Sequence, residues 1–378
     1  MSDPTPAPLP TLIPLPAFGA VKAGARIDLP PLAGSADALA VAQLAQPGKL
    51  LAVVSANPLD AQRLKEEIAW FAPGLRVHLL SDWETLPYDA FSPHQDLVSE
   101  RLATLYAVSQ GACDVLIAAA STALVRIAPP DFLAAHTFFL KKDGKLNLDK
   151  LREQLTRGGY AHMTQVVAAG EYSVRGGIVD LFPMGAALPY RIELFDDSIE
   201  TIRVFDVDSQ RTLYPVPEIR LLPAREFPMS EAGRTKFRQR FREVFEGDAS
   251  RISLYKDVSN GTPPAGIEYY LPLFFDETAT LFDYLPADAT LLLHHDVPNA
   301  IAEFWHDTNT RFNLLKGDRS RPLFPPPQLF LTEEEFFVAA KQYPALRLGA
   351  AETTDDAAAR RLGGLAIERN ADAPLSAL

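Results

Sequence analysis

A repeated alternation of apolar strand and amphipathic helix, between residues 49 and 118, constrains the fold of this chain most. The run LLAVVSA has the continuous apolar character of a buried strand, and Leu64, Ile68 and Phe71 follow it at helical spacing. The runs RVHLL and DVLIA supply two further strands, with a helix expected over residues 97–110 between them. This alternation predicts a parallel sheet with helices on both faces.

The pattern changes after His136. A strand HTFFLKK and a helix that ends at Gly158 lead into successive strands with short turns, which continue to Thr212. This segment predicts an α+β insert that is mostly antiparallel. The run EIRLLP, a charged helix over 230–246 and the strand ATLLLHH then return to the first style. We therefore expect a discontinuous α/β domain that is interrupted by a smaller insert.

The predicted boundaries follow from these changes. The proline-broken residues 1–20 form a mobile leader, without the basic start of a signal peptide. The run RPLFPPPQ is expected to be a stiff linker, and Thr332 with Glu335 predicts a capping box at the start of a further helix. The expected divisions are 21–132 with 214–320 for the α/β domain, 133–213 for the insert, 321–328 for the linker, and 329–378 for the truncated start of a further small domain.

The insert contains a hairpin with an unusual polar face, within the stretch from Gly170 to Leu213. Alternation over residues 190–195 places Arg191, Glu193 and Phe195 on one face of a strand. After a turn, the strand over 199–205 is expected to bring Arg203 and Phe205 beside Arg191 and Phe195. Exposed arginine with exposed aromatic is the composition that interface centres favour. The face therefore predicts a protein-binding surface.

Composition limits the kind of partner. With 378 residues and 47% hydrophobic composition, the chain is long enough for two or three globular domains. Its formal net charge of −12 argues against a general nucleic-acid coat. The lone Cys113 lies in an apolar run, which predicts a buried thiol and a reducing, cytoplasmic location. No apolar run approaches the roughly 20 residues of a membrane span.

A phosphate-binding loop is expected in an α/β domain, and only a degenerate one is visible. The run LAGSADAL has Gly34 and Ser35 of such a loop, but Asp37 stands where a phosphate-binding lysine belongs. The strand ATLLLHH ends in His294 and His295 instead of acidic residues for Mg²⁺. We predict no working ATPase here and no cofactor. We also predict no metal site, because adjacent strand residues point to opposite faces.

Two further segments have alternative interpretations. The helix over 230–246 carries the densest basic run, which is typical of a solvated face or, as the alternative, of a DNA-binding module; its basic residues are Arg234, Lys236, Arg238, Arg240 and Arg242. The segment from Trp83 to Leu105 is expected to be a loop that packs over the sheet edge, followed by an amphipathic helix.

Four long motifs occur together, in the order WETLPYDAFSPHQDLVSERLATLY, RGGIVDLFPMG, PYRIELFDDSIETIRVFDVDSQRTL and GTPPAGIEYYLPLFF. In this combination the chain, from about residue 15 to 345, resembles the N-terminal region of the bacterial transcription-repair coupling factor family, Mfd. That region is similar to the first two domains of the excision-repair helicase UvrB. The resemblance implies a helicase-like, P-loop NTPase-type fold with degenerate ATPase motifs.

The resemblance also implies a function. Mfd displaces RNA polymerase stalled at DNA damage with an ATP-driven translocase, and it recruits UvrA through its UvrB-like second domain. The family's UvrA contact falls here on Arg175, Arg191 and Phe195. The same surface is covered in resting Mfd by the C-terminal domain, which implies autoinhibition. The translocase that uses ATP and Mg²⁺, and the polymerase- and DNA-binding domains, are expected outside this fragment.

One alternative to the partner contact stays open at this point. Arg175 or Arg191 can instead pair internally with Glu193 or Asp180, because all of these lie within the same short run of strands.

Overall fold

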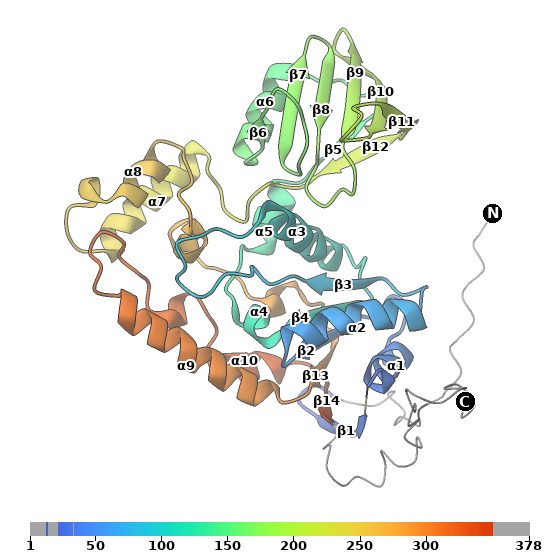
Figure 1. Cartoon of the computed structure of the whole chain (residues 1–378), viewed down its shortest axis with the longest axis vertical. Helices are drawn as coiled ribbons and strands as arrows, with labels where there is room; N and C mark the ends of the chain where they lie inside the picture. Colours follow the sequence, from blue (N-terminus) through green and yellow to red (C-terminus); the bar gives the residue numbers. More distant parts are fainter. Residues whose placement is uncertain (1–12, 14–21, 33, 351–378) are drawn as a thin grey trace, which may run out of the picture.

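The computed structural model describes residues 13, 22–32 and 34–350. Its larger part is built on a six-stranded parallel sheet of order β1-β14-β13-β2-β4-β3 (Figure 1). Every adjacent pair in this sheet is parallel. Its strands are β1 (Arg26–Leu32), β2 (Leu51–Ser55), β3 (Val77–Leu80), β4 (Val115–Ala119), β13 (Thr290–His294) and β14 (Ala345–Ala350).

Both faces of this sheet are covered by helices. Alternate residues of β2 enter different cores: Leu51 and Val53 contact one cluster, and Ala52 and Val54 contact the other. The first cluster is closed by α1 (Ala36–Leu44) and α2 (Pro58–Phe71). The second is closed by α3 (Gln95–Ser109), α4 (Ala120–Leu124), α9 (Val297–Leu315) and α10 (Glu333–Ala340). The predicted parallel sheet with helices on both faces is therefore confirmed.

The insert stands beside this domain as a second sheet, of order β11-β10-β9-β8-β7-β6 (Figure 1). Its pairs are antiparallel except β6–β7. The predicted α+β, mostly antiparallel insert is confirmed at this level. Helix α5 (Pro130–Ala135) leads into the insert, whose elements are β5 (Phe138–Lys141), α6 (Leu148–Arg157), β6 (Ala161–His162), β7 (Glu171–Arg175), β8 (Ile178–Leu181), β9 (Tyr190–Phe195), β10 (Ser198–Phe205) and β11 (Thr212–Pro215).

One strand lies across an expected boundary. β12 (Glu218–Leu221), which the sequence assigned to the α/β domain, pairs with β5 in an antiparallel two-stranded sheet. The backbone of residues 218–221 therefore belongs with the insert, because its ladder partner does. The insert extends beyond the expected end at residue 213.

The region after the insert contains an aromatic core. Helices α7 (Glu231–Val244) and α8 (Ser253–Ser259) meet the 3₁₀ segment Ile267–Leu273 around Phe237, Phe241 and Phe274. Short 3₁₀ turns also form at Ala249–Arg251, Leu281–Tyr284 and Pro326–Gln328. Ser230 caps α7 by accepting a hydrogen bond from Gly233 N–H, as an N-cap serine should.

The expected linker and the further domain need correction. Within 321–328, Phe324 is buried in the aromatic core and Pro326 is also buried, so this run is packed against the domain and does not separate two domains. The predicted capping box of α10 is confirmed, with both reciprocal bonds present. However, α10 packs on the large sheet and β14 pairs with β1 and β13. Residues 329–350 thus complete the α/β domain, and the rest of the expected further domain lies outside the described residues.

The insert is seated tightly against α3. Gly185, at φ +77°, donates its N–H to Ser99 Oγ over 2.7 Å. A Cβ at this glycine would lie 2.8 Å from the Cβ of Ala103, so a side chain here would push the insert away from the helix. Gln95 also donates to the carbonyl of Ala224. The core residues of the insert and of this face of the large sheet form one continuous cluster.

The loop before α3 is held in an uncommon conformation. Tyr88 is buried with φ +67°, a value that bulky residues rarely adopt. Arg311 and Arg321 donate to the carbonyls of Pro87 and Asp89, and Tyr88 donates to the carbonyl of Phe324. These contacts keep the loop packed, as the sequence predicted.

Within the described part of the chain, none of the helices is both long and apolar enough to span a membrane.

Candidate protein-interaction site

Strands β7 to β10 bring the predicted contact residues onto one face of the insert. Arg175 is opposite Ile178, Asp180 is opposite Arg191, and Arg191 is opposite Arg203 in the ladders. Directly opposed residues point to the same side of a sheet, and so do residues two apart on one strand. Arg175, Arg191 and Phe195 therefore share a face. The alternation along a single strand could not establish this for Arg175, because Arg175 lies on a different strand.

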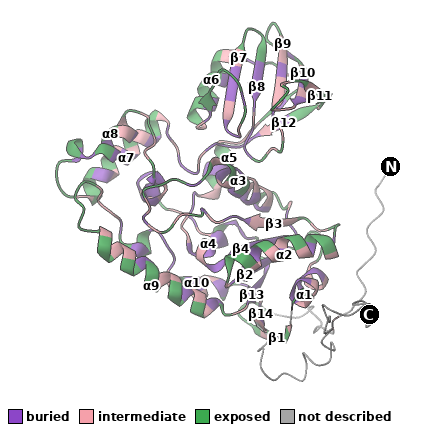
Figure 2. Cartoon of the chain, viewed as in Figure 1, coloured by how far each residue is buried: buried purple, intermediate pink, exposed green. Residues whose placement is uncertain are grey.

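These residues differ in exposure. Phe195 is 76% exposed, and the side chain of Arg175 is 56% exposed. The side chain of Arg191 is only 17% exposed. Figure 2 shows buried, intermediate and exposed stretches along the strands of the insert. Access to the face is therefore greatest at Arg175 and Phe195.

Both arginines bind the buried carboxylate of Asp180, which is 1% exposed. Arg191 donates from Nε to Oδ1 over 2.7 Å and from Nη2 to Oδ2 over 3.0 Å. Arg175 donates from Nη2 to the same Oδ2. The internal pairing considered from the sequence thus exists, and its acceptor is Asp180. Glu193 instead accepts a hydrogen bond from Thr201.

Phe205 corrects one expectation. The sequence placed it on the exposed face beside Phe195, but it is fully buried, and the guanidinium of Arg191 lies 5.1 Å from its ring centroid. Gln210 covers this end: its carbonyl accepts from Arg191 Nη1, and its side chain donates to the carbonyl of Val166. The face therefore has a closed end at Phe205 and an open end, which we define as Arg175, Ile178 and Phe195.

The loop that the sequence suggested as a degenerate nucleotide loop contains the protein's own ion pairs. Gly34 has φ +56°, and Ser35 donates to Glu67. Asp37 is buried, and both of its carboxylate oxygens accept hydrogen bonds from Arg63, over 3.0 and 2.6 Å. The carboxylate also lies 3.0 Å from Nε2 of His294, at the end of β13. The ion pair of Asp37 and Arg63 therefore lies between this loop and β13.

The ionisation of Asp37 follows from these contacts. Burial alone would raise its pKa, but the hydrogen bonds with His294 and Arg63 outweigh burial and hold the pKa well below its usual range. The side chain is therefore a carboxylate at neutral pH. Like charges repel, so this carboxylate opposes the binding of a phosphate at the same loop.

The two histidines depart from the expected strand geometry. His295 follows β13 with φ +64°, and its ring stacks on that of His294 at a centroid distance of 3.7 Å. The two rings do not point to opposite faces, so that argument against a metal was wrong. Potential ligand atoms of Asp37, His294 and His295 lie within 4.8 Å of one another. Arg63 nevertheless donates to both oxygens of Asp37, so the carboxylate atoms that a metal would bind are already engaged.

Comparison with known proteins identifies the family. The UvrB interaction domain family matches residues 138–227, which include every strand of the candidate face. The transcription-repair-coupling factor of Escherichia coli is 43% identical over 95% of this chain, and that of Haemophilus influenzae is 41% identical over 82%. The Bacillus subtilis factor is 25% identical over 70%.

The chain belongs to the transcription-repair-coupling factors. It corresponds to their N-terminal region and carries the UvrB interaction domain. It spans about a third of the Escherichia coli factor, 32% of its length, and 27% of the Haemophilus influenzae factor.

In this member of the transcription-repair-coupling factors, the basic residues of α7 contact other residues of the same domain. Arg234 and Arg238 donate to Glu231, Lys236 to Asp276, and Arg240 to the carbonyls of Pro272 and Phe275. The guanidinium of Arg242 lies 5.4 Å from the ring centroid of Tyr255. Arg242 is exposed and the other four are partly exposed, so these residues lie at the surface, and their pairing within the domain gives little support to the alternative of DNA binding by α7.

Arg240→Ala is therefore expected to lower stability. The side chain is 27% exposed and donates to two carbonyls and to Asp276, so its loss should lower the free energy of unfolding by about 1–3 kcal/mol. Urea denaturation measures this change. Arg251→Ala, at a side chain 86% exposed, is the matched control and should change it by less than about 0.5 kcal/mol. A DNA affinity that falls in Arg240→Ala with stability unchanged would contradict the assignment.

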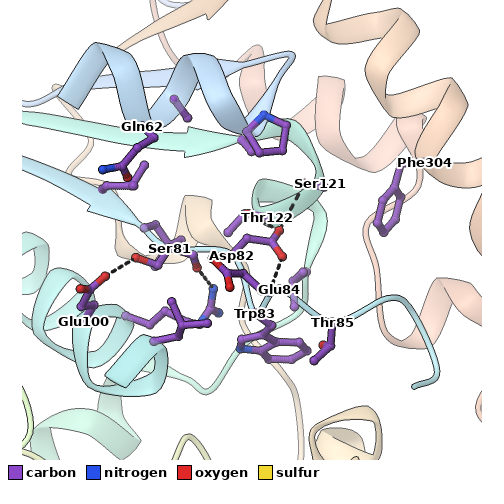
Figure 3. Close-up of a pocket in the computed structure, with 18 of the residues that line it drawn as sticks. Gln62, Ser81, Asp82, Trp83, Glu84, Thr85, Glu100, Ser121, Thr122 and Phe304 are labelled. Atoms are coloured by element: carbon purple, nitrogen blue, oxygen red, sulfur yellow. Dashed lines mark hydrogen bonds between the residues drawn. The ribbon is translucent and has the colours of Figure 1, made fainter. Parts of the chain in front are cut away.

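A cavity lies at the carboxyl ends of β3 and β4, where α/β folds commonly bind ligands (Figure 3). It has a volume of about 610 Å³ and is lined by Asp82, Glu84 and Glu100 among mainly apolar side chains. Asp82 accepts from Thr122 and Glu100 accepts from Ser81. Lys65 and Arg101 line the same cavity, so it holds basic as well as acidic side chains.

Proposed function

We propose that this chain is the part of a transcription-repair-coupling factor that recruits UvrA to RNA polymerase stalled at DNA damage. The contact is made by the insert through Arg175, Arg191 and Phe195. This proposal is supported by the family match over residues 138–227 and by the common face on which the three side chains lie. Arginine donates paired bonds to partner carboxylates, and phenylalanine contributes buried apolar area.

We further propose that the region has a helicase-like, P-loop NTPase-type fold without an ATPase of its own. The Asp37–Arg63 pair at the degenerate loop supports this, because it puts a carboxylate where phosphates would bind. ATP-driven translocation with Mg²⁺, and contacts with RNA polymerase and DNA, then belong to other domains of the cytoplasmic parent protein. Its C-terminal domain covers the insert face and thereby keeps UvrA away until the factor is engaged.

The observation that carries the proposal is the exposure of Phe195. A phenylalanine 76% exposed at the end of a strand adds little to the core, and it shares a face with two arginines. An exposed aromatic with arginine is the usual centre of an interface.

Phe195→Ala is expected to weaken UvrA binding at least tenfold, because the loss of an aromatic anchor usually costs about 2 kcal/mol or more. Titration of the fragment with UvrA by isothermal calorimetry measures the affinity. Phe91→Ala is the matched control, since Phe91 is 72% exposed and lies outside the insert. Equal affinities for the wild type and Phe195→Ala would refute the proposed contact.

A further inference from the structure

We infer that Ile178 is a further contact residue of this face and that Asp180 is a positioning residue that holds Arg175 and Arg191 for the partner. This inference rests on the proposed function, since it specifies how the same face recognises its partner. A partner surface that fits this face has a carboxylate next to an apolar recess. The carboxylate binds Arg175, and the recess accommodates Ile178 and Phe195.

Ile178 has the placement of a contact residue. It begins β8 directly after the turn Gly176-Gly177, where Gly176 has φ +60°. It is opposite Arg175 on one side and Glu193 on the other, so it lies on the same face and diagonal to Phe195. An isoleucine 37% exposed at the open end continues the apolar area of Phe195. It is among the most apolar side chains and stays accessible only where no other element covers the sheet.

Asp180 determines where the two guanidinium groups lie. It binds Arg191 through two hydrogen bonds, and Phe205 and the carbonyl of Gln210 complete the surroundings of Arg191. Among the residues that the structure describes, Arg175 is bound through Nη2 alone, and its side chain stays 56% exposed. Its Nε and Nη1 are therefore available to a partner while the side chain is already oriented. Ordering a long side chain before binding lowers the entropic cost of association.

The contact role of Ile178 is tested by Ile178→Ala in the full chain. We expect UvrA affinity to fall about threefold to tenfold, because a partly exposed side chain loses a moderate apolar contact. Val338→Ala is the matched control, since Val338 is 55% exposed on α10, outside the insert. Unchanged affinity in Ile178→Ala, with Phe195→Ala impaired, would overturn the assignment of Ile178.

The positioning role of Asp180 is tested by a double-mutant cycle of Asp180→Asn with Arg175→Ala. Asn keeps the size of the side chain and removes its charge. Asp180→Asn alone should weaken UvrA binding at least about fivefold, and its effect should be at least about threefold smaller when Arg175 is already Ala. A residue with only a structural role would reduce the affinity equally in both backgrounds, and that result would overturn the inference.

If Asp180→Asn does not fold, an NMR measurement on the wild-type protein tests the positioning role instead. The Nη2–H signals of Arg175, the group that donates to Asp180, should be resolved and slow to exchange with water in ¹⁵N NMR spectra, since Asp180 holds this end of the side chain. A fast-exchanging, averaged signal would overturn the positioning role. Failure of the proposed function gives a different result. UvrA would then not bind the wild-type chain, or it would bind Phe195→Ala and Arg175→Ala as tightly as the wild type.

Discussion

Arg101→Met is expected to lower the free energy of unfolding by about 3–5 kcal/mol. Arg101 is fully buried on α3, and it donates from Nε to Glu226 over 2.7 Å and from Nη1 to the carbonyl of Ser81 over 2.7 Å. Glu226 is 4% exposed. Removal of the arginine therefore leaves a buried carboxylate without its counter-charge, which costs far more than the hydrogen bonds themselves.

The double variant Arg101→Met with Glu226→Gln separates these two costs. It removes both charges, so at least half of the lost stability should return. Urea denaturation of the two single variants and the double variant measures the cycle. If the double variant loses as much free energy of unfolding as the two single variants together, the loss comes from packing and not from the unpaired charge. This pair ties α3 to the segment that leaves the insert, so the loss should also loosen the insert from α3.

Asp37→Asn is expected to lower the free energy of unfolding by about 2–4 kcal/mol at pH 7, because it breaks a pair in which Asp37 is buried. The pKa of Asp37 is held below its usual value in the folded protein, so its stabilisation is fully present above the unfolded pKa of about 4. As the pH falls below about 4, the unfolded chain takes up the proton first, and the stabilisation is lost progressively. The stability difference between wild type and variant should therefore be constant from pH 5 to 7 and shrink below pH 4.

Asp60→Asn provides the control for this prediction. Asp60 also binds Arg63, over 3.3 Å, but its side chain is 27% exposed, so its loss should cost less than about 1 kcal/mol. Urea denaturation of wild type and both variants at several pH values tests the comparison. A difference between wild type and Asp37→Asn that widens below pH 4 would contradict the role of the carboxylate.

Much of the fold could be predicted because the apolar patterns are strong. Buried strands such as β2 and the capping box of α10 carry local signals that tertiary contacts did not change. The strand β14 was missed, although Leu346 and Leu348 alternate, because the preceding prolines indicated a linker. Prolines restrict the backbone locally, but they do not determine whether Phe324 or Pro326 is buried.

The candidate site was partly predictable. Alternation along β9 was enough to place Arg191 with Phe195, and Arg175 matched the family's motif. Phe205 was expected to be exposed because a pattern on one strand does not show which loop covers its face, and here Gln210 and its neighbours cover it. The pairing of Asp180 with both arginines depends on strand register, which links β7, β8 and β9. The turn at His295, with its positive φ, also depends on tertiary contacts.

The position of β1 has a consequence for folding during synthesis. Among the described strands, β1 is hydrogen-bonded only to β14, which starts more than three hundred residues later at Ala345. At the usual rate of translation, β1 waits about 15–60 s for its partner to be made. A waiting strand is a template for aggregation, and prolines weaken such templates because they have no N–H to donate. Pro30 and Pro31 lie within β1, so the strand is poorly suited to bind another chain while the ribosome completes the sheet.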